Sequence, residues 1–459
     1  MIRRAPLRGD ELPAIVVPPP GPRSRAAARR LRRAEGAAIW GSDASPIVWK
    51  RARGSVVEDL DGNRYVDLTG GFGVAALGHA APEVRRAVAA QAGKLIQGLG
   101  DLHPHETREK LARRVASLGG PLSKALLAST GSEAVELALQ TAALATGRRR
   151  FVAFEGGYHG QSGVALEATH FPPSSPLLLP AGPARAMHIP YPDPRRCAAR
   201  RGCSACDLAC LEEGWRRVER ECDGPDPPGA VIVEPIQGRA GVIVPPPAFL
   251  PRLSALARAR GMLVILDEIM TGAGRTGPFW AWERCGATAE PDLLTAGKAL
   301  GGGVAIAALL GKPAIMEAWA KHAPASGEAP YASTFYAHPL ACAGALAAIE
   351  RLAAPGTRAE VERKGALLEE TLRAAATPGW EVRAAGLMAA VAAPGRPGAG
   401  VALASRLLGR GVLAIPGGLD GTCASMLPAY TMGDGQIRDA AERIGVALGD
   451  GSTRGSEAV

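Results

Sequence analysis

Short apolar runs alternate with longer amphipathic stretches between about residues 105 and 345. This alternation is typical of a sheet whose parallel strands are connected by helices. The clearest strands predicted by the pattern are residues 125–128, 151–154, 230–233 and 262–266. We therefore expect an α/β fold in which a large domain is built on a mostly parallel central sheet.

The segments on either side of this region show a mixed pattern. Residues 56–68 alternate apolar and polar positions around Asp61-Gly62-Asn63, which predicts a β-hairpin with its turn at these three residues. Residues 83–91 are helical by composition, and beyond about residue 345 helical stretches alternate with short apolar runs. The pattern predicts a second, smaller α+β domain built from both ends of the chain.

Length and residue usage agree with a globular chain of more than one domain. The protein has 459 residues, of which 47% are hydrophobic and 21% charged, and this length suits two or three domains. We divide it into an N-terminal arm (1–35), a first part of the small domain (36–100), the large domain (101–345) and the C-terminal part of the small domain (346–459).

The arm holds much of the chain's excess positive charge. Lys and Arg outnumber Asp and Glu by 53 to 44, which gives a net charge of +9, and residues 23–33 read RSRAAARRLRR. Because only 4% of the residues are aromatic, we interpret this charge as an arm on the protein surface and expect no nucleic-acid partner. The prolines at positions 18, 19, 20 and 22 argue against an amphipathic targeting helix in the arm.

The apolar runs are too short to cross a membrane. The best candidate, residues 304–311, stops at Lys312, whereas a spanning helix needs about 20 apolar residues. The N-terminus also has no apolar core of the kind that signal peptides contain. We therefore expect a cytoplasmic protein with no membrane partner.

Five of the eight cysteines fall between Cys197 and Cys222. Cys203-Ser-Ala-Cys206 is a CxxC motif flanked by Cys197 and Cys210, and four thiolates this close could hold zinc or an iron–sulfur cluster. The pairs are not separated as they are in a zinc ribbon, so free thiols in a reducing compartment are the preferred interpretation. A metal at this cluster stays open as the alternative, and we expect none in the catalytic site.

Polar residues follow the predicted strands at their carboxyl ends, where open α/β sheets bind ligands. Gly131 and Ser132 stand between one strand and a helical stretch, so the helix start could hold a phosphate or be a plain N-cap. Tyr158 follows the strand at 151–154 and could stack on a flat heterocycle or be a half-buried loop residue.

Asp267 and Lys298 complete this set. Asp267 follows the strand at 262–266. The lack of a Walker motif counts against magnesium binding at this carboxylate, which can instead pair with a protonated pyridine nitrogen. Lys298 follows an apolar run and precedes the glycines 301–303. Desolvation would lower the pKa of its amine and make it a nucleophile for a carbonyl, although a surface lysine on a loop is the alternative.

The number and order of these motifs resemble the class III (ω-type) aminotransferases, which are fold-type I enzymes dependent on pyridoxal 5′-phosphate (PLP). The acid and the lysine are 298 − 267 = 31 residues apart, and the resemblance covers roughly residues 40–450. Its further motifs are Asp61-Gly62-Asn63-Arg64-Tyr65-Val66-Asp67, Gly78-His79, Glu234-Pro235-Ile236-Gln237-Gly238, Asp267-Glu268-Ile269, Gly272-Ala-Gly274-Arg275-Thr276-Gly277, Ser333-Thr334-Phe335 and His338-Pro339-Leu340-Ala341.

The resemblance implies a role for each of these residues. Lys298 would carry PLP as a Schiff base and move the proton, while Asp267 pairs with the pyridine nitrogen. The remaining implied cofactor contacts are Tyr158 and Ile269 on the two ring faces, Gly131 and Ser132 at the phosphate, Glu234 and Gln237 around the ring, and Thr334 at the phosphate of the neighbouring subunit. A homodimer with shared active sites is thereby implied.

The sequence departs from the family pattern on the substrate side. Where members that use glutamate or 4-aminobutyrate carry Arg, Glu and Arg, this chain has Gln161, Arg239 and Ser425, and Met270 replaces a common glutamine. We expect Val74, Gln161 and Arg239 to contact the substrate. Arg239 would bind an anionic or carbonyl-rich group of the substrate. The alternative is that its side chain turns outward and pairs with an acidic residue on the surface.

The resemblance implies an aminotransferase that moves an amino group from an amine or amino acid to a keto acid or aldehyde. Another PLP reaction on the same fold, by an aminomutase, decarboxylase or lyase, is the alternative closest to it. A catalytically silent binding protein that kept the fold is the alternative from another class, and the presence of Lys298 argues against it.

Overall fold

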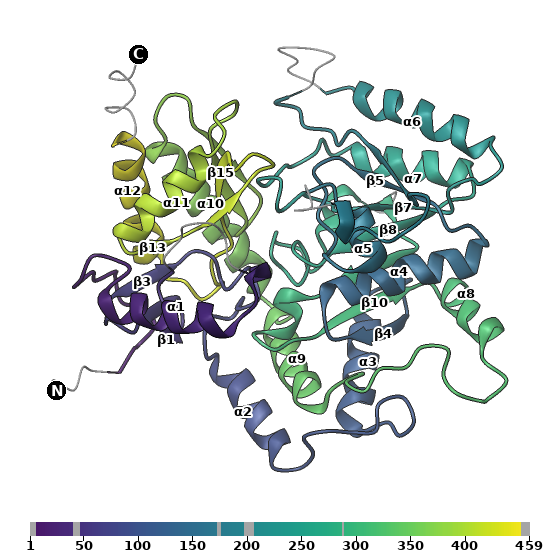
Figure 1. Ribbon diagram of the computed structural model, residues 1–459, viewed down its shortest axis with the longest axis horizontal. Coiled ribbons are helices and arrows are strands. Elements are labelled where there is room, and N and C mark those ends of the chain that lie inside the picture. The colour runs from purple at the N-terminus through teal and green to yellow at the C-terminus, as the bar shows by residue number, and fades with distance from the viewer. Residues whose placement is uncertain (1–5, 40–45, 172–175, 197–205, 287–288, 451–459) are drawn as a thin grey trace. The chain divides into compact units, whose positions relative to one another are not determined.

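The computed structural model describes residues 6–39, 46–171, 176–196, 206–286 and 289–450. These residues form two compact units (Figure 1). The large unit is Pro82–Val361, and the small unit combines the residues up to Ala81 with those from Glu362 onward. The sequence placed these boundaries near residues 100 and 345; α2 (Pro82–Ala92) lies in the large unit because it packs against α9 (Pro339–Leu352).

The large unit is built on a seven-stranded sheet with the order β4-β10-β9-β8-β7-β5-β6. Its strands are β4 (Lys124–Ala128), β5 (Phe151–Phe154), β6 (Ala186–Ile189), β7 (Ala230–Val233), β8 (Leu263–Glu268), β9 (Leu293–Ala296) and β10 (Ala307–Gly311). Strands β6, β5, β7, β8 and β9 pair in parallel, and β10 is antiparallel to both of its neighbours. The four strands predicted from the sequence are confirmed as β4, β5, β7 and β8, within a mostly parallel sheet.

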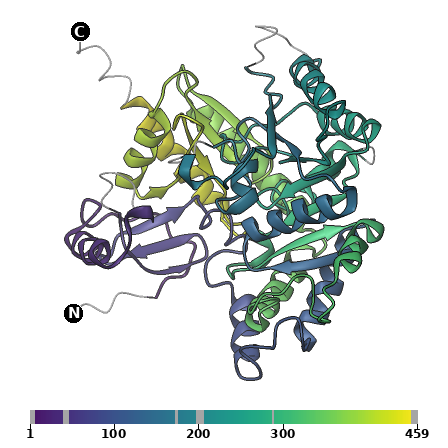
Figure 2. The same ribbon diagram turned by 45° about the vertical axis from the view of Figure 1, so that its right-hand side comes forward.

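Helices cover both faces of this sheet (Figure 2). Along β7 and β8, successive side chains point to opposite faces. Val231 and Val264 pack with Phe249 of α7, whereas Ile232 and Ile265 pack in the cluster that contains α4. The helices of this unit are α2, α3 (Glu106–Leu118), α4 (Gly131–Thr146), α5 (Gly163–Ala168), α6 (Ala209–Cys222), α7 (Phe249–Ala259), α8 (Pro313–Met316) and α9.

The small unit contains two four-stranded sheets. Their orders are β1-β2-β3-β13, with β1 (Trp49–Arg53), β2 (Val56–Asp59), β3 (Arg64–Asp67) and β13 (Val412–Leu413), and β11-β12-β15-β14, with β11 (Glu381–Ala384), β12 (Ala389–Ala392), β14 (Ile415–Gly417) and β15 (Cys423–Met426). The predicted hairpin is confirmed as β2–β3. Segments from both ends of the chain build this unit, as predicted, and the pairing of β13 with β3 places them in one sheet.

Four helices complete the description: α1 (Pro22–Ala34), α10 (Thr357–Ala375), α11 (Ala399–Gly409) and α12 (Asp434–Gly449). Helix α1 lies in the predicted arm, so the expectation that its prolines exclude a helix is wrong. Pro22 occupies the first turn, where a missing N–H costs no hydrogen bond. The carboxylate of Asp61, from the hairpin turn, accepts hydrogen bonds from the backbone N–H groups of Arg23 and Ser24 and so caps this helix.

Candidate active site

Loops at the carboxyl ends of β4, β5, β7, β8 and β9 meet around one pocket of the large unit, with a volume of about 210 Å³. The residues that line it are Thr130, Gly131, Ser132, Tyr158, His159, Gly160, Glu234, Arg239, Asp267, Ile269, Met270 and Lys298. The structure therefore brings together the polar residues that the sequence placed after separate strands.

The start of α4 forms one wall of this pocket. Thr130 caps the helix, because its side chain accepts a hydrogen bond from the N–H of Glu133 (3.1 Å). A Cβ atom on Gly131 would lie 3.1 Å from Cγ2 of Ile269, so glycine at this position lets Ile269 approach the helix start closely. The unpaired N–H groups of a first helical turn, together with the hydroxyl of Ser132, make a suitable seat for a phosphate.

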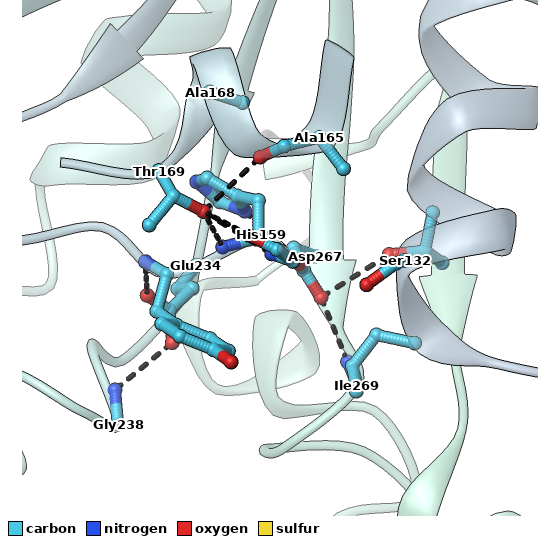
Figure 3. Close-up of polar contacts among 12 residues, drawn as sticks. Ser132, His159, Ala165, Ala168, Thr169, Glu234, Gly238, Asp267 and Ile269 are labelled. Carbon is cyan, nitrogen blue, oxygen red and sulfur yellow. Dashed lines mark hydrogen bonds and ion pairs between the residues drawn. The ribbon is translucent and has the colours of Figure 1, made fainter. Parts of the chain in front are cut away.

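Asp267 lies buried at the end of β8 and is held from several sides (Figure 3). Its Oδ1 accepts hydrogen bonds from the N–H of Ile269 (3.0 Å) and the hydroxyl of Thr295 (3.2 Å). Its Oδ2 lies 2.7 Å from Nδ1 of His159. These contacts fix the orientation of the carboxylate.

His159 is a site residue to which the sequence reasoning gave no role. Its side chain is fully buried, and its Nε2 has no hydrogen-bond partner among the described residues. Burial disfavours the charged ring, but the hydrogen bond to Asp267 and the charges of Asp267 and Glu234 raise the pKa of His159 above its ordinary value. A histidine directly after Tyr158, at the end of a strand, was the available signal.

Lys298 follows β9 and begins a short 3₁₀ turn, Lys298–Gly301. Its backbone φ of +43° lies in the left-handed region, which is costly for a residue with a side chain and is common at functional sites. Burial lowers the pKa of the Lys298 amine, and the positive charges of Arg239 and Arg275 act in the same direction, while Asp267 and Glu234 oppose them. A lowered pKa makes the neutral, nucleophilic amine more available.

Glu234 connects two of the pocket loops. Its carboxylate accepts hydrogen bonds from the backbone N–H groups of Tyr158 (3.0 Å) and Gly238 (2.9 Å), as Figure 3 shows for the contact with Gly238. Burial raises the pKa of Glu234 to about 7. Gln237 is not among the residues that line the pocket; its amide donates to the carbonyl of Glu155 (2.8 Å) and supports the loop from behind.

The residues expected to contact the substrate are placed differently from one another. Arg239 lines the pocket, with its guanidinium carbon 6.0 Å from the ring centroid of Tyr158 and 5.2 Å from that of Phe171. Gln161 is exposed and is not among the lining residues; its backbone N–H donates to Ser132 (3.3 Å). Val74 lies in the small unit.

Met270 adds an apolar side chain to the pocket wall at a position that differs from the family pattern. A Cβ on Gly238 would collide with the Met270 sulfur, so the glycine makes room for this side chain. Thr334 is exposed, and its carbonyl accepts a hydrogen bond from the side chain of Gln97 (2.7 Å).

Part of the cysteine cluster falls outside the described residues, namely Cys197 and Cys203. Cys206 and Cys210 lie within the described residues, and that part of the chain contains no group of three or more potential metal ligands. The choice between thiols and a metal at this cluster stays a prediction. None of the helices in the described ranges is long and apolar enough to cross a membrane.

Comparison with known proteins decides the family. Residues 39–448 match the family model described as aminotransferase class III. The chain belongs to the class III aminotransferases. Among its relatives, this class III aminotransferase is 36% identical over 347 residues to an acetylornithine aminotransferase of Methanopyrus kandleri, a match that covers 75% of this chain and 80% of the relative.

A 5-aminovalerate aminotransferase of Pseudomonas aeruginosa is also 36% identical, over 66% of this chain and 68% of its own length. The crystal structure of a thermostable ω-transaminase fourfold mutant from Pseudomonas jessenii matches with a TM-score of 0.84 and 25% identity, over 92% of this chain and 98% of that one. The ω-transaminase from Pseudomonas jessenii in complex with PMP matches with a TM-score of 0.82 and 24% identity, over 90% and 96%. The predicted family, fold, PLP dependence and aminotransferase function are therefore confirmed.

Proposed function

We propose that this PLP-dependent aminotransferase holds its cofactor in the pocket around Lys298, and that Lys298 and Asp267 are its catalytic residues. The observation that carries the proposal is their common pocket: the only carboxylate described there besides Glu234 is Asp267, and the only amine is that of Lys298. Of the two carboxylates, Asp267 is the one paired with a histidine, and Lys298 supplies the amine.

The chemistry of the pocket walls fits the group. Gly131 and Ser132 at the start of α4 would hold the phosphate, since the open helix end offers N–H donors, and the missing Cβ lets Ile269 lie close to that helix start. Tyr158 and Ile269, which both line the pocket, would cover the two faces of the ring. Glu234 would act from behind by fixing the backbone at Tyr158.

When bound, PLP supplies an electron sink that stabilises negative charge on the substrate carbon next to nitrogen. Asp267 would sustain that property by keeping the ring nitrogen protonated, and His159 stabilises Asp267 as an anion. Lys298 would hold the cofactor through its amine, and the lowered pKa of that amine would suit it to move the proton at the reacting carbon. The substrates are an amine or amino acid as donor and a keto acid or aldehyde as acceptor.

Arg239 is proposed to bind an anionic group of the substrate. It lines the same pocket as Lys298, and a guanidinium can bind a carboxylate at two points. We keep Gln161 and Val74 as weaker candidates for substrate contact, since neither is among the residues that line the described pocket.

We further propose a homodimer in which Thr334 reaches the partner's phosphate site. Thr334 is exposed, and the segment 96–102 lies beside it, because Gln97 donates to its carbonyl and the backbone of Gly100 approaches that of Ser333. Exposed apolar side chains occur on both sides of this contact, namely Ile96, Leu99, Leu102 and Phe335. A cluster of exposed apolar residues is typical of a protein interface. A cytoplasmic location remains part of the proposal.

A half-reaction assay tests the proposed function. The yellow holoprotein is mixed with a panel of amines and amino acids, and its visible absorbance is followed before and after a keto acid or aldehyde is added. Loss of the absorbance with the amine and its return with the carbonyl compound is the expected result. If carbon dioxide or ammonia is released from the amine and the carbonyl compound does not restore the absorbance, the enzyme would instead be a decarboxylase or lyase.

A further inference from the structure

Arg239 sits in the corner formed by two aromatic rings. Tyr158 and Phe171 meet edge to face, with centroids 6.2 Å apart and planes at 83°. The guanidinium carbon of Arg239 lies over both rings, 5.2 Å from the centroid of Phe171 and 6.0 Å from that of Tyr158. Both distances are within the range at which a ring face attracts a cation.

Phe171 differs from the other two residues because it is not among those that line the pocket. Its ring, which is partly buried, supports the guanidinium without forming pocket wall itself. A change at Phe171 would therefore act on a substrate through Arg239. This placement makes Phe171 a positioning residue.

Holding the guanidinium in place has a direct consequence for binding. A free arginine side chain loses much rotamer freedom when it binds a ligand, and a side chain already held by its neighbours loses less. The aromatic contacts use the face of the guanidinium, whereas it is the N–H edge that matches a carboxylate at two points.

We propose that Phe171 is a specificity-determining residue: its ring holds Arg239 over the pocket, so that the enzyme prefers amino substrates with a carboxylate at the end remote from the amine. This inference rests on the proposed substrate role of Arg239. The ring of Tyr158 assists, and it couples the arginine to a wall of the cofactor pocket.

The test compares 5-aminovalerate with pentylamine, two amines of the same chain length of which only the first has a carboxylate. The rate of absorbance loss of the holoenzyme is measured against the concentration of each amine, which separates half-saturation from maximal rate. The variants are F171L, F171M, F171Y, R239Q and the double variant F171L/R239Q. Retained visible absorbance of bound cofactor and an unchanged melting temperature show that each variant is folded.

F171L and F171M are expected to lower the preference for 5-aminovalerate by about fivefold, because they remove the ring. The change should lie mainly in a higher half-saturating concentration of 5-aminovalerate and not in the maximal rate. F171Y keeps a ring face and is expected to keep the preference. R239Q is expected to lower it by about tenfold or more, the loss of a charge-assisted hydrogen bond. In the double variant, F171L should lower the preference no further, since its effect passes through Arg239.

Each contrary outcome has a separate meaning. If R239Q lowers the preference for 5-aminovalerate but F171L and F171M do not, the proposed role of Phe171 is wrong and that of Arg239 stands. An equal loss for both amines in the Phe171 variants shows a purely structural residue and also overturns it. If R239Q changes nothing, or if the unaltered enzyme does not distinguish the two amines, the proposed substrate role of Arg239 fails as well.

Discussion

His159 Nδ1 lies 2.7 Å from Asp267 Oδ2, and both side chains are buried. The two residues come from the ends of different strands, 108 positions apart in the chain. A buried carboxylate is costly without a partner, and this imidazole supplies one that can carry positive charge. The pair therefore holds an anion at the place where the proposed mechanism requires it.

Replacing Asp267 by Asn removes the charge and keeps the shape. We expect D267N to slow the proton-transfer step by a hundredfold or more, while PLP binding weakens much less. The reason is that the pKa of the ring nitrogen would fall by about two units, at about 1.4 kcal/mol each. Single-turnover rates with a substrate deuterated at the reacting carbon, and PLP titration of the apoenzyme, measure the two effects separately. Near-normal turnover in D267N would show that Asp267 is not the partner of the ring nitrogen.

The His159–Asp267 pair should make stability depend on pH. Because folding raises the pKa of His159, the pair stabilises the protein fully below the unfolded pKa of about 6.5, and this contribution disappears as the pH rises through the folded pKa. At pH 6 we expect H159Q to melt well below the wild type, with a free energy of unfolding lower by about 3 kcal/mol. The difference in melting temperature between the two proteins should become smaller by pH 9.

Thr295→Val is the control for this prediction. It removes another hydrogen bond from Asp267 without removing a titrating group. Its melting temperature should therefore differ from that of the wild type by a similar amount at both pH values. A gap for H159Q that is constant with pH, or that widens toward pH 9, would contradict the charged pair.

Gly131 offers a test of the proposed phosphate seat. In G131A the new Cβ would lie 3.1 Å from the side chain of Ile269, so either the helix start or the ring-covering residue must shift. We expect PLP affinity to fall by about tenfold, a loss on the order of 1.4 kcal/mol. The matched control is Gly435→Ala in α12, where a Cβ meets nothing within 4 Å and where alanine favours the helix. Equal PLP affinity of G131A and the control would argue against the seat.

The shared active site can be tested by mixing two inactive variants, K298A and Thr334→Glu. In a mixed dimer both defects fall in one site, and the other site has an intact lysine and an intact threonine. After subunit exchange we expect about a quarter of wild-type activity, since half of the dimers are mixed and each has one working site of two. Absence of recovery, with exchange demonstrated by labelled subunits, counts against a site completed by Thr334.

The strands and the polar residues at their ends were accessible from the sequence, because each apolar run stops at a polar or glycine residue that the proposed chemistry uses. Asp267 and Lys298 are examples, since a carboxylate and a lysine at the carboxyl ends of buried strands have few structural reasons to be there. The antiparallel direction of β10 could not be predicted from the sequence. Its residues form an apolar run without polar alternation, and such a run is equally compatible with parallel and antiparallel pairing.

Contacts between distant loops were also beyond the sequence pattern. His159 meets Asp267, and Phe171 meets Arg239, only because the ends of several strands converge at one edge of the sheet. Helix α1 was missed for another reason: its N-terminus is capped by Asp61 from the hairpin, a tertiary contact that local proline content does not reveal. The exposed position of Gln161 likewise depends on how its loop folds over Ser132.

The central claim, that Lys298 carries the cofactor, is tested most directly by reducing the holoenzyme with sodium borohydride and locating the label by peptide mass spectrometry. Reduction fixes PLP to the nitrogen to which it was bound. The account predicts that the mass of the reduced cofactor is found on Lys298, and that K298A treated in the same way carries no label. Recovery of the label on any other lysine of the wild-type protein would contradict it.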